Sequence, residues 1–259
     1  MILAGIDIGG TKMEVSLFDV EEQLQDKDFD LYMRGQSLQA KKIIAKRVPT
    51  DRHRGYEKVC DSLAKLIIDT LEEAQVSFDE LNSIGIGLPG IIDPVSMKMT
   101  NGNTGIFIGK DLVGDLQKKT DSNVDIYIAN DANCFALAEA VAGAGVIYQQ
   151  ESGRPISSHM AIGMIIGTGC GGGFIHGGHM LTGRNGASAE IGHSTLVTNG
   201  HPCYCGKNGC AEQYLSGPGL EAAYASRIYT QIDKRPNARD IFDMAANQEP
   251  QAKAQVKQF

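Results

Sequence analysis

The chain has 259 residues, 42% of them hydrophobic, and a formal net charge of −7. This length and composition can bury a substantial core in one large domain or two modest ones, which excludes a disordered chain as the default. The negative charge provides no general attraction for nucleic acid or for an anionic membrane surface, so neither is expected as a partner.

The N-terminal apolar run is interrupted by Asp7 and by glycines, and therefore lacks the core of a signal peptide. No other stretch approaches the roughly 20 apolar residues of a membrane span. We therefore expect a cytoplasmic protein whose six cysteines are thiols or metal ligands rather than a disulfide framework.

Two strands are predicted at residues 2–8 and 13–18, joined by a glycine turn. A carboxylate at the strand end precedes glycines, whose missing Cβ lets backbone N–H groups approach an anion, and a hydroxyl and an ammonium follow. This order suits a nucleotide phosphate tail with Mg²⁺, and an ordinary β-hairpin is the alternative. The residues concerned are Gly5, Asp7, Gly9, Gly10, Thr11 and Lys12.

The next segments combine polar and amphipathic patterns. Residues 19–39 are polar and acidic, which indicates an insertion or extended loop before a strand at residues 43–48. Apolar residues then recur at helical spacing over residues 59–74, after the candidate caps Thr50 and Asp51.

Strands predicted at residues 83–88 and 124–129 alternate with helices, which favours an α/β fold. Asp131 follows the second strand, in the first turn of an alanine-rich helix, where α/β sheets bind ligands. An aspartate there can cap the helix. The helix dipole would also keep it ionised, which suits a general base that accepts a proton from an alcohol.

A second glycine turn follows an apolar strand at residues 160–166 and precedes a returning strand at residues 174–176. It does not match a Walker sequence and opens onto no helix, which disfavours P-loop and dinucleotide-binding folds. Because a strand, a glycine turn with threonine and a strand occur twice, we predict two related halves. The second set of glycine-turn residues is Gly167, Thr168, Gly169, Gly171, Gly172 and Gly173.

Three cysteines cluster within eight residues: Cys203, Cys205 and Cys210. Gly206 and Gly209 allow the tight turns that wrap a tetrahedral ion. A Cys-x-Cys disulfide would be strained and three cysteines cannot pair completely, so a zinc site is favoured. His193 and His201 are both candidates for the fourth ligand, and His201 is the nearer in sequence.

The paired glycine turns resemble the phosphate motifs of the actin and hexokinase-like ATPase superfamily, and within it the ROK family of repressors, open reading frames and kinases. Three further motifs, at residues 130–134, 190–193 and 203–212, are similar to ROK sugar kinases. The resemblance implies two ribonuclease-H-like α/β domains around a cleft, here residues 1–129 and 130–259, with a zinc-binding loop in the second.

The resemblance also implies roles for single residues. Asp131 would accept the proton of a sugar 6-hydroxyl as it attacks the γ-phosphoryl group, and His193 would complete the zinc site. The implied sugar contacts are Asn130, Asp131, Glu190, His193 and Glu212. The implied cofactors are ATP with Mg²⁺ and a structural Zn²⁺, and the implied partners are the sugar and ATP, with a homodimer left open.

The substrate is less sharply implied. Residues 167–174 and 212–217 resemble N-acetylglucosamine kinases, whereas residues 165–170 and 202–207 resemble bacterial fructokinases. We expect N-acetyl-D-glucosamine, with fructokinase or glucokinase activity as alternatives, while residues 100–105 depart from both patterns.

Two alternatives lie outside catalysis. ROK repressors carry an added DNA-binding winged helix at the N-terminus. This chain starts on the first predicted strand, which disfavours a repressor. The presence of Asp131 and of both glycine turns disfavours a sugar sensor without catalytic activity.

At the other end, the polar helical pattern of residues 251–259 stops without a capping glycine or a following strand. We therefore expect a fragment of a longer kinase, with weakened ATP affinity and exposed apolar surface.

Overall fold

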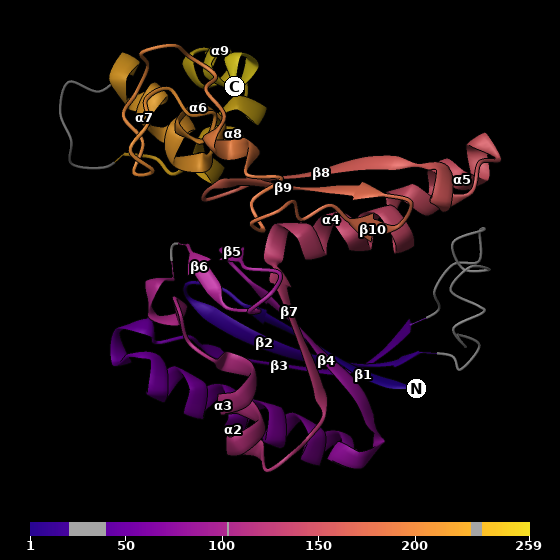
Figure 1. Ribbon diagram of the computed structural model, residues 1–259. Coiled ribbons are helices and arrows are strands. Elements are labelled where there is room, and N and C mark those ends of the chain that lie inside the picture. The colour runs from indigo at the N-terminus through magenta and orange to yellow at the C-terminus, as the bar shows by residue number, and fades with distance from the viewer. Residues whose placement is uncertain (21–39, 103, 229–234) are drawn as a thin grey trace. The chain divides into compact units, whose positions relative to one another are not determined.

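The structure is a computed structural model that describes residues 1–20, 40–102, 104–228 and 235–259 (Figure 1). It divides into two compact units. The first contains Met1–Gly163 and Gly173–Ser188, and the second contains Met164–Gly172 and Ala189–Phe259. The predicted domain boundary between residues 129 and 130 falls inside the first unit and stays a prediction. The polar loop predicted up to residue 39 lies almost entirely outside the described residues.

The first unit is built on a five-stranded sheet with the order β3-β2-β1-β4-β7. Its strands are β1 (Ile2–Ile8), β2 (Lys12–Val20), β3 (Ala40–Pro49), β4 (Leu81–Leu88) and β7 (Asp125–Asn130). The β1–β2 and β2–β3 pairs are antiparallel, whereas β1–β4 and β4–β7 are parallel. The carboxyl ends of β1, β4 and β7 therefore meet at one edge of the sheet. A short hairpin of β5 (Ile91–Ile92) and β6 (Met99–Asn101) follows β4.

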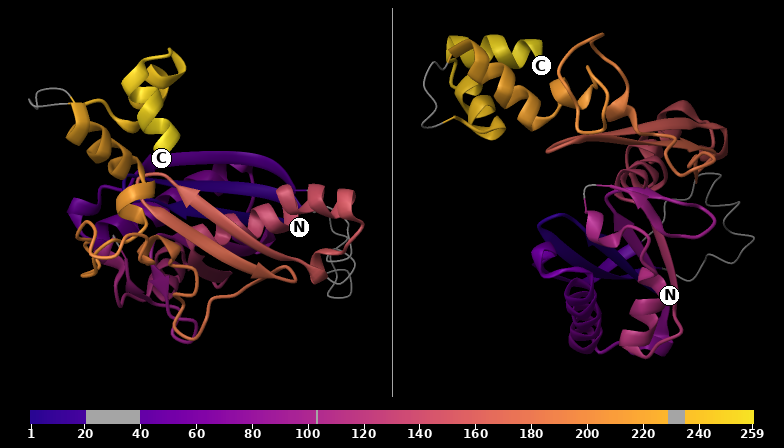
Figure 2. Two further views of the ribbon diagram at one scale, coloured as in Figure 1. Left: turned by 90° about the horizontal axis from the view of Figure 1, so that it is seen from above. Right: turned by 60° about the vertical axis from the view of Figure 1, so that its left-hand side comes forward.

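Helices α2 (Tyr56–Ala74) and α3 (Leu112–Thr120) lie side by side on one face of this sheet (Figures 1 and 2). The side chains of Val59, Leu63 and Ile67, four residues apart along α2, are at most 1% exposed. This spacing places them on one helical face, where they pack against the buried apolar residues of the strands. The mixed α/β fold predicted from the sequence is confirmed.

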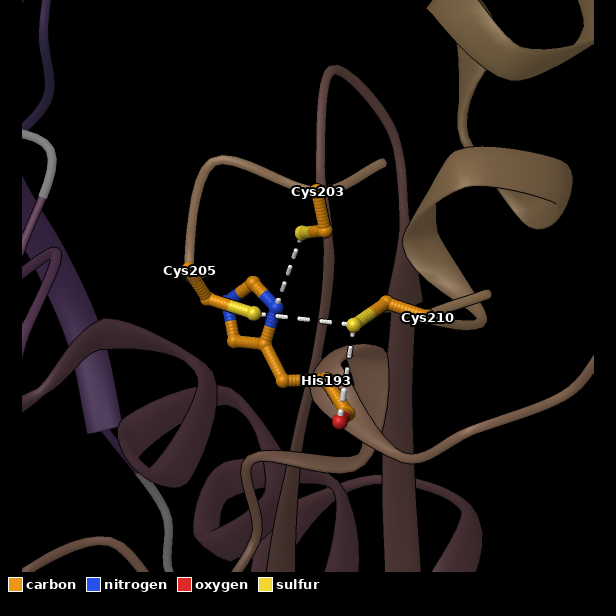
Figure 3. A group of neighbouring side chains, drawn as sticks. All are labelled: His193, Cys203, Cys205 and Cys210. Carbon is orange, nitrogen blue, oxygen red and sulfur yellow. Dashed lines mark hydrogen bonds between the residues drawn. The ribbon is translucent and has the colours of Figure 1, made fainter. Parts of the chain in front are cut away.

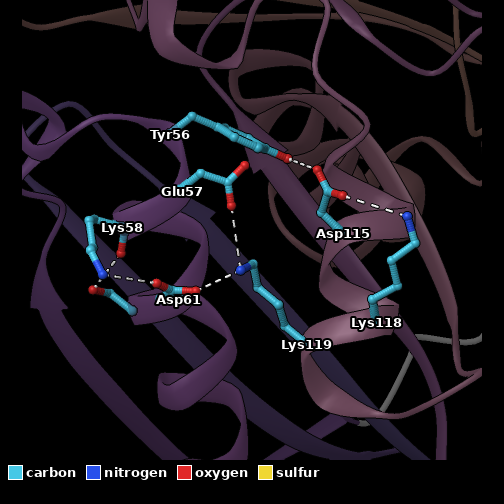
Figure 4. Close-up of polar contacts among 8 residues, drawn as sticks. Tyr56, Glu57, Lys58, Asp61, Asp115, Lys118 and Lys119 are labelled. Carbon is cyan, nitrogen blue, oxygen red and sulfur yellow. Dashed lines mark hydrogen bonds and ion pairs between the residues drawn. The ribbon is translucent and has the colours of Figure 1, made fainter.

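Polar contacts fasten α2 to α3 (Figure 4). The Tyr56 hydroxyl donates to Asp115 Oδ2 at 2.8 Å, and Lys119 Nζ donates to Asp61 Oδ1 at 2.6 Å. Burial, together with the hydrogen bond to Asp115, raises the pKa of the Tyr56 hydroxyl well above its usual value. These contacts hold the first turn of α2 in place.

The start of α2 differs from the sequence expectation. The helix begins at Tyr56 with Gly55 at its N-cap position, so neither Thr50 nor Asp51 caps it. Thr50 instead donates a hydrogen bond from its hydroxyl to the Gly9 carbonyl at 2.7 Å. The prediction that Thr50 caps α2 was wrong because its hydrogen-bond partner, Gly9, is 41 positions away in the sequence.

The remaining strands form a three-stranded sheet with the order β10-β9-β8. They are β8 (Met160–Ile166), β9 (Cys170–His176) and β10 (His179–Met180). β9 thus begins four residues earlier than predicted. The outward-facing side chains of Met160 and Ile162 on β8 are 66% and 61% exposed.

Helices α4 (Asp131–Ala142) and α5 (Ala144–Ser152) precede β8. A Cβ added at Gly163 or at Gly173 would lie 2.5 or 2.6 Å from the Ala136 Cβ. Glycine at both positions therefore allows the close approach of α4.

The described residues of the second unit include a loop region and the helices α6 (Glu212–Leu215), α7 (Gly217–Ile228), α8 (Ala238–Ala246) and α9 (Pro250–Gln258). Its small core consists of Leu220, Tyr224, Ile241 and Ala252, each at most 1% exposed. The helices in the described parts of the chain include no candidate for a membrane-spanning segment.

Candidate functional site

The first glycine turn, residues 9–12, joins β1 to β2. The Gly9 N–H donates to the Lys12 carbonyl at 2.9 Å, and a Cβ at Gly9 would lie 3.1 Å from that same oxygen. Thr11 and Lys12 are exposed at this turn. Gly5 lies within β1, where a Cβ would lie 3.5 Å from the Phe18 ring, an ordinary van der Waals distance.

The sheet register brings two carboxylates to one edge. Asp7 on β1 is beside Gly87 on β4, and Gly87 is beside Ala129 on β7. Asp131 follows β7 directly, and a Cβ at Gly87 would lie 3.6 Å from the Asp131 Cα. The carboxyl ends of the three parallel strands thus carry Asp7 and Asp131, as expected for a ligand site in an α/β sheet.

Both carboxylates hold their protons more tightly than usual. Burial is the main cause for Asp131, and the charge of Asp7 adds to it, although the Ala132 N–H at 2.8 Å lowers the pKa. Desolvation and then the charge of Glu14 raise the pKa of Asp7. The net shift for Asp131 is upward, opposite to the expected effect of the helix dipole, because desolvation outweighs it.

The helix cap is Asn130 rather than Asp131. Asn130 Oδ1 accepts the Asn133 N–H at 3.0 Å, and Asn130 Nδ2 donates to the Gly90 carbonyl at 3.0 Å. The Asn130 amide therefore ties β7, α4 and the segment after β4 together. Asp131 is therefore not the N-cap residue, although its Oδ1 accepts the Ala132 N–H within the first turn of α4 at 2.8 Å.

The second glycine turn, residues 167–169, joins β8 to β9. The Gly167 N–H donates to the Gly169 carbonyl at 2.9 Å, and the Gly167 carbonyl accepts the Gly217 N–H at 2.7 Å. Thr168 is exposed at its tip. Gly171, Gly172 and Gly173 lie in β9 beyond the turn.

Glu212, at the start of α6, lies against this turn. Its Oε2 accepts the Cys170 N–H at 3.0 Å, and a Cβ at Gly169 would lie 2.8 Å from the same oxygen. No sequence signal predicted this bond, because the two residues are 42 positions apart. The turn and the helix that follows the cysteine cluster are therefore directly connected.

The four predicted metal ligands come together in the second unit (Figure 3). His193, Cys203, Cys205 and Cys210 place their ligand atoms within 4.8 Å of one another. The Cys205 and Cys210 Sγ atoms are 3.6 Å apart, as are the Cys203 Sγ and the His193 Nδ1. A tetrahedral zinc with Zn–S near 2.3 Å needs ligand separations of about 3.6–3.8 Å. The donor set therefore fits zinc, and the two separations of 3.6 Å match this geometry.

The two candidate histidines have different surroundings. His193 follows Glu190 in a 3-10 turn (Ile191–His193), and its Nδ1 faces the thiols while its Nε2 is 3.0 Å from the Tyr204 hydroxyl. His201 is outside the cluster, and its ring packs on Tyr214 with a centroid distance of 5.2 Å. A bond on the second nitrogen fixes the ring of a metal-binding histidine, so Tyr204 supports the site.

The thiols themselves are unequal. Burial, with the neighbouring thiols, raises the pKa of Cys210 to about 11, whereas the Lys207 N–H lowers the pKa of Cys205. Gln213 Nε2 donates to the Cys203 Sγ at 3.6 Å. Sequence spacing found the cysteines but gave no signal for Gln213 or Tyr204.

Comparison with known proteins places the chain among sugar-phosphorylating relatives. The ROK family model matches residues 3–259. The chain is 32% identical to an N-acetyl-D-glucosamine kinase of Shigella flexneri and 34% identical to one of Vibrio parahaemolyticus, in each case over 98% of this chain and 75% of the relative. The crystal structure of a ROK hexokinase from Thermus thermophilus matches 99% of this chain and 72% of that one, with 27% identity and a TM-score of 0.70.

Proposed function

Since the chain belongs to the ROK family, we propose that it is a kinase that transfers the γ-phosphoryl group of ATP to the 6-hydroxyl of a hexose. Asp131 carries this proposal, because its partly buried carboxylate, with a raised pKa, stands at the same sheet edge as Asp7 and the first glycine turn. A base with raised proton affinity accepts a proton from an alcohol more readily than an ordinary carboxylate does.

The reaction would proceed by direct transfer. Asp131 accepts the proton of the 6-hydroxyl, the sugar oxygen forms a bond to the γ-phosphorus, and the bond to the β–γ bridging oxygen breaks to release ADP. The two glycine turns and Lys12 hold the phosphates, and Asp7 would ligate Mg²⁺, which offsets phosphate charge when bound. Such reactions depend mainly on positioning and charge stabilisation.

The proposed sugar contacts are Asn130, Asp131, Glu190, His193 and Glu212. Zinc held by His193 and the three cysteines would be structural: it would fix the His193 ring so that Nε2 faces outward. That nitrogen is 3.0 Å from the Tyr204 hydroxyl, which supports a polar role for it.

We propose N-acetyl-D-glucosamine as the substrate, since both curated relatives named above carry that activity in their names. Glucose and fructose are the alternatives. The motif at residues 202–207 supports fructose in particular, since it resembles the fructokinases.

A coupled ADP-release assay over a sugar panel tests the proposal. We expect ADP release with N-acetyl-D-glucosamine at the highest kcat/KM and a product phosphorylated at the 6-position. Turnover with fructose or glucose but not with the amino sugar would overturn the substrate. Sugar binding by calorimetry without any ADP release would overturn the activity and support a sugar sensor.

A further inference from the structure

The segment between β3 and α2 is bonded to the first glycine turn. Thr50 is 1% exposed, its N–H donates to the Thr11 carbonyl at 3.0 Å and its hydroxyl donates to the Gly9 carbonyl at 2.7 Å. These two bonds flank Gly10. The residues that follow Thr50 are therefore held beside this turn.

Arg52 is placed against Gly10 by that arrangement. A Cβ at Gly10 would lie 3.8 Å from the Arg52 Nη1, which is van der Waals contact. Asp51 adopts a left-handed backbone conformation with φ 49°, which turns the chain into the short 3-10 helix Arg52–Arg54. On the other side, the contact of Tyr56 with Asp115 fixes the start of α2. Both ends of the segment are thus anchored.

The charges around this turn are unbalanced. Arg47 is paired with Glu14, and Arg54 Nη1 lies 4.0 Å from Asp51. Within the described parts of the chain, neither Arg52 nor Lys12 forms an ion pair. Two cations that lie outside any ion pair, beside a glycine turn, favour an anionic ligand.

We propose that Arg52 is a phosphate-binding residue, whose guanidinium pairs with the terminal phosphate of ATP beside Gly10. The inference rests on the proposed kinase function. An arginine suits this position because its planar guanidinium donates two parallel hydrogen bonds to phosphate oxygens, which a lysine cannot do. No bond of the nucleotide changes in this contact, and the phosphate is held through its non-bridging oxygens.

Binding measurements on Arg52→Ala, Arg52→Lys and the matched control Arg54→Ala test the proposal. Arg54 is exposed in the same 3-10 helix but pairs with Asp51, so it controls for a general loss of positive charge. The ligands are the non-hydrolysable ATP analogue AMP-PNP with Mg²⁺, ADP, AMP, the sugar and the sugar 6-phosphate, each titrated by calorimetry.

We expect Arg52→Ala to weaken AMP-PNP binding about tenfold, as for the loss of a charge-assisted hydrogen bond. ADP should be affected less, AMP and the sugar not at all, and Arg52→Lys should restore part of the loss. Arg54→Ala should bind every ligand as the wild type does.

Three outcomes would overturn the inference: unchanged AMP-PNP binding by Arg52→Ala, an equal loss for AMP, or a loss confined to the sugar 6-phosphate. An equal loss of AMP-PNP binding in Arg54→Ala would show that Arg52 acts only through its positive charge at long range, and this result would also overturn the inference. If the wild-type protein binds AMP-PNP but releases no ADP with any sugar, the proposed function is contradicted. The Arg52 variants then still decide whether Arg52 contacts the phosphate. Wild-type protein that binds no nucleotide would contradict both.

Discussion

Asp131 has an environment that suits catalysis and opposes stability. Its carboxylate is removed from water and stands near the charge of Asp7, and the hydrogen bond from the Ala132 N–H offsets these effects only in part. An ionised group in such a place costs folding free energy, and the same cost raises its affinity for a proton. Replacing Asp131 should therefore separate the two effects.

We expect Asp131→Asn to lower kcat by a factor on the order of 10² or more, because an amide cannot accept the proton of the 6-hydroxyl. Sugar affinity should change little, since the amide oxygen can still accept the Ala132 N–H and the side chain has the same shape. Steady-state rates and calorimetric titration of the sugar check this together. Near-normal kcat would show that Asp131 is not the base.

The same substitution should stabilise the folded protein at neutral pH. Because the folded-state pKa of Asp131 is raised, its contribution to stability falls as the pH rises through the unfolded pKa, about 3.9, toward the folded pKa. Asp131→Asn removes this cost and should raise Tm measurably at pH 7.5.

The gain should shrink as the pH is lowered toward 4, where the wild-type carboxyl becomes protonated. Asp125→Asn, at an exposed position on β7, is the control and should leave Tm unchanged. A lower Tm for Asp131→Asn at neutral pH would mean that the carboxylate makes stabilising contacts that outweigh its burial.

At the scale of elements, glycines decide how closely the segments around the metal cluster approach. Gly206 and Gly209 both have a left-handed backbone, with φ 88° and 75°. A Cβ at Gly209 would overlap the Val197 carbonyl oxygen, whereas a Cβ at Gly206 would have open space around it beyond its neighbours in the chain. The two positions therefore share backbone strain but differ in packing.

Gly206→Ala should cost about 1 kcal/mol, from the left-handed backbone alone. Gly209→Ala should cost about 3 kcal/mol or more and should release zinc, because the clash displaces the backbone beside Cys210. Chemical denaturation and elemental analysis of the purified variants measure both effects. Equal losses in the two variants would show that the packing against Val197 does not matter.

At the scale of the whole molecule, the two units have separate cores of unequal size. The first unit buries a continuous apolar cluster across β1, β2, β4, α2 and α3, whereas the apolar cluster among the described residues of α7, α8 and α9 has four fully buried members. A small core is stabilised more strongly by a metal than a large one is. The second unit should therefore depend on zinc.

Removing zinc with a chelator, or by Cys205→Ser, should speed amide hydrogen exchange in residues 189–228 by at least tenfold. Exchange in β1, β4 and β7 should stay within twofold of the untreated protein, because their core contains no metal ligand. Cys60→Ala, which removes a buried thiol of α2, should leave the zinc content unchanged. A uniform increase across both units would contradict separate stabilisation, and no increase would exclude a structural role for zinc.

The sequence by itself determined the elements and the local clusters. Helical spacing of apolar residues located α2, because burial on one face imposes a period near four on a helix, and apolar runs located β1, β4 and β8. The three cysteines lie within eight residues, so their spacing alone was enough to indicate a metal site. The resemblance then selected His193, and the cluster contains that histidine.

The tertiary structure decided the contacts between residues far apart in the chain. Thr50 looked like a helix cap and instead bonds Gly9, 41 positions away, and Glu212 bonds the Cys170 N–H, 42 positions away. The direction of the Asp131 pKa shift also required the structure, because the local helix dipole lowers it while burial beneath distant segments raises it. The local sequence determines which side chains a segment carries. The burial of those side chains and their hydrogen bonds to distant residues depend on which other segments pack against it.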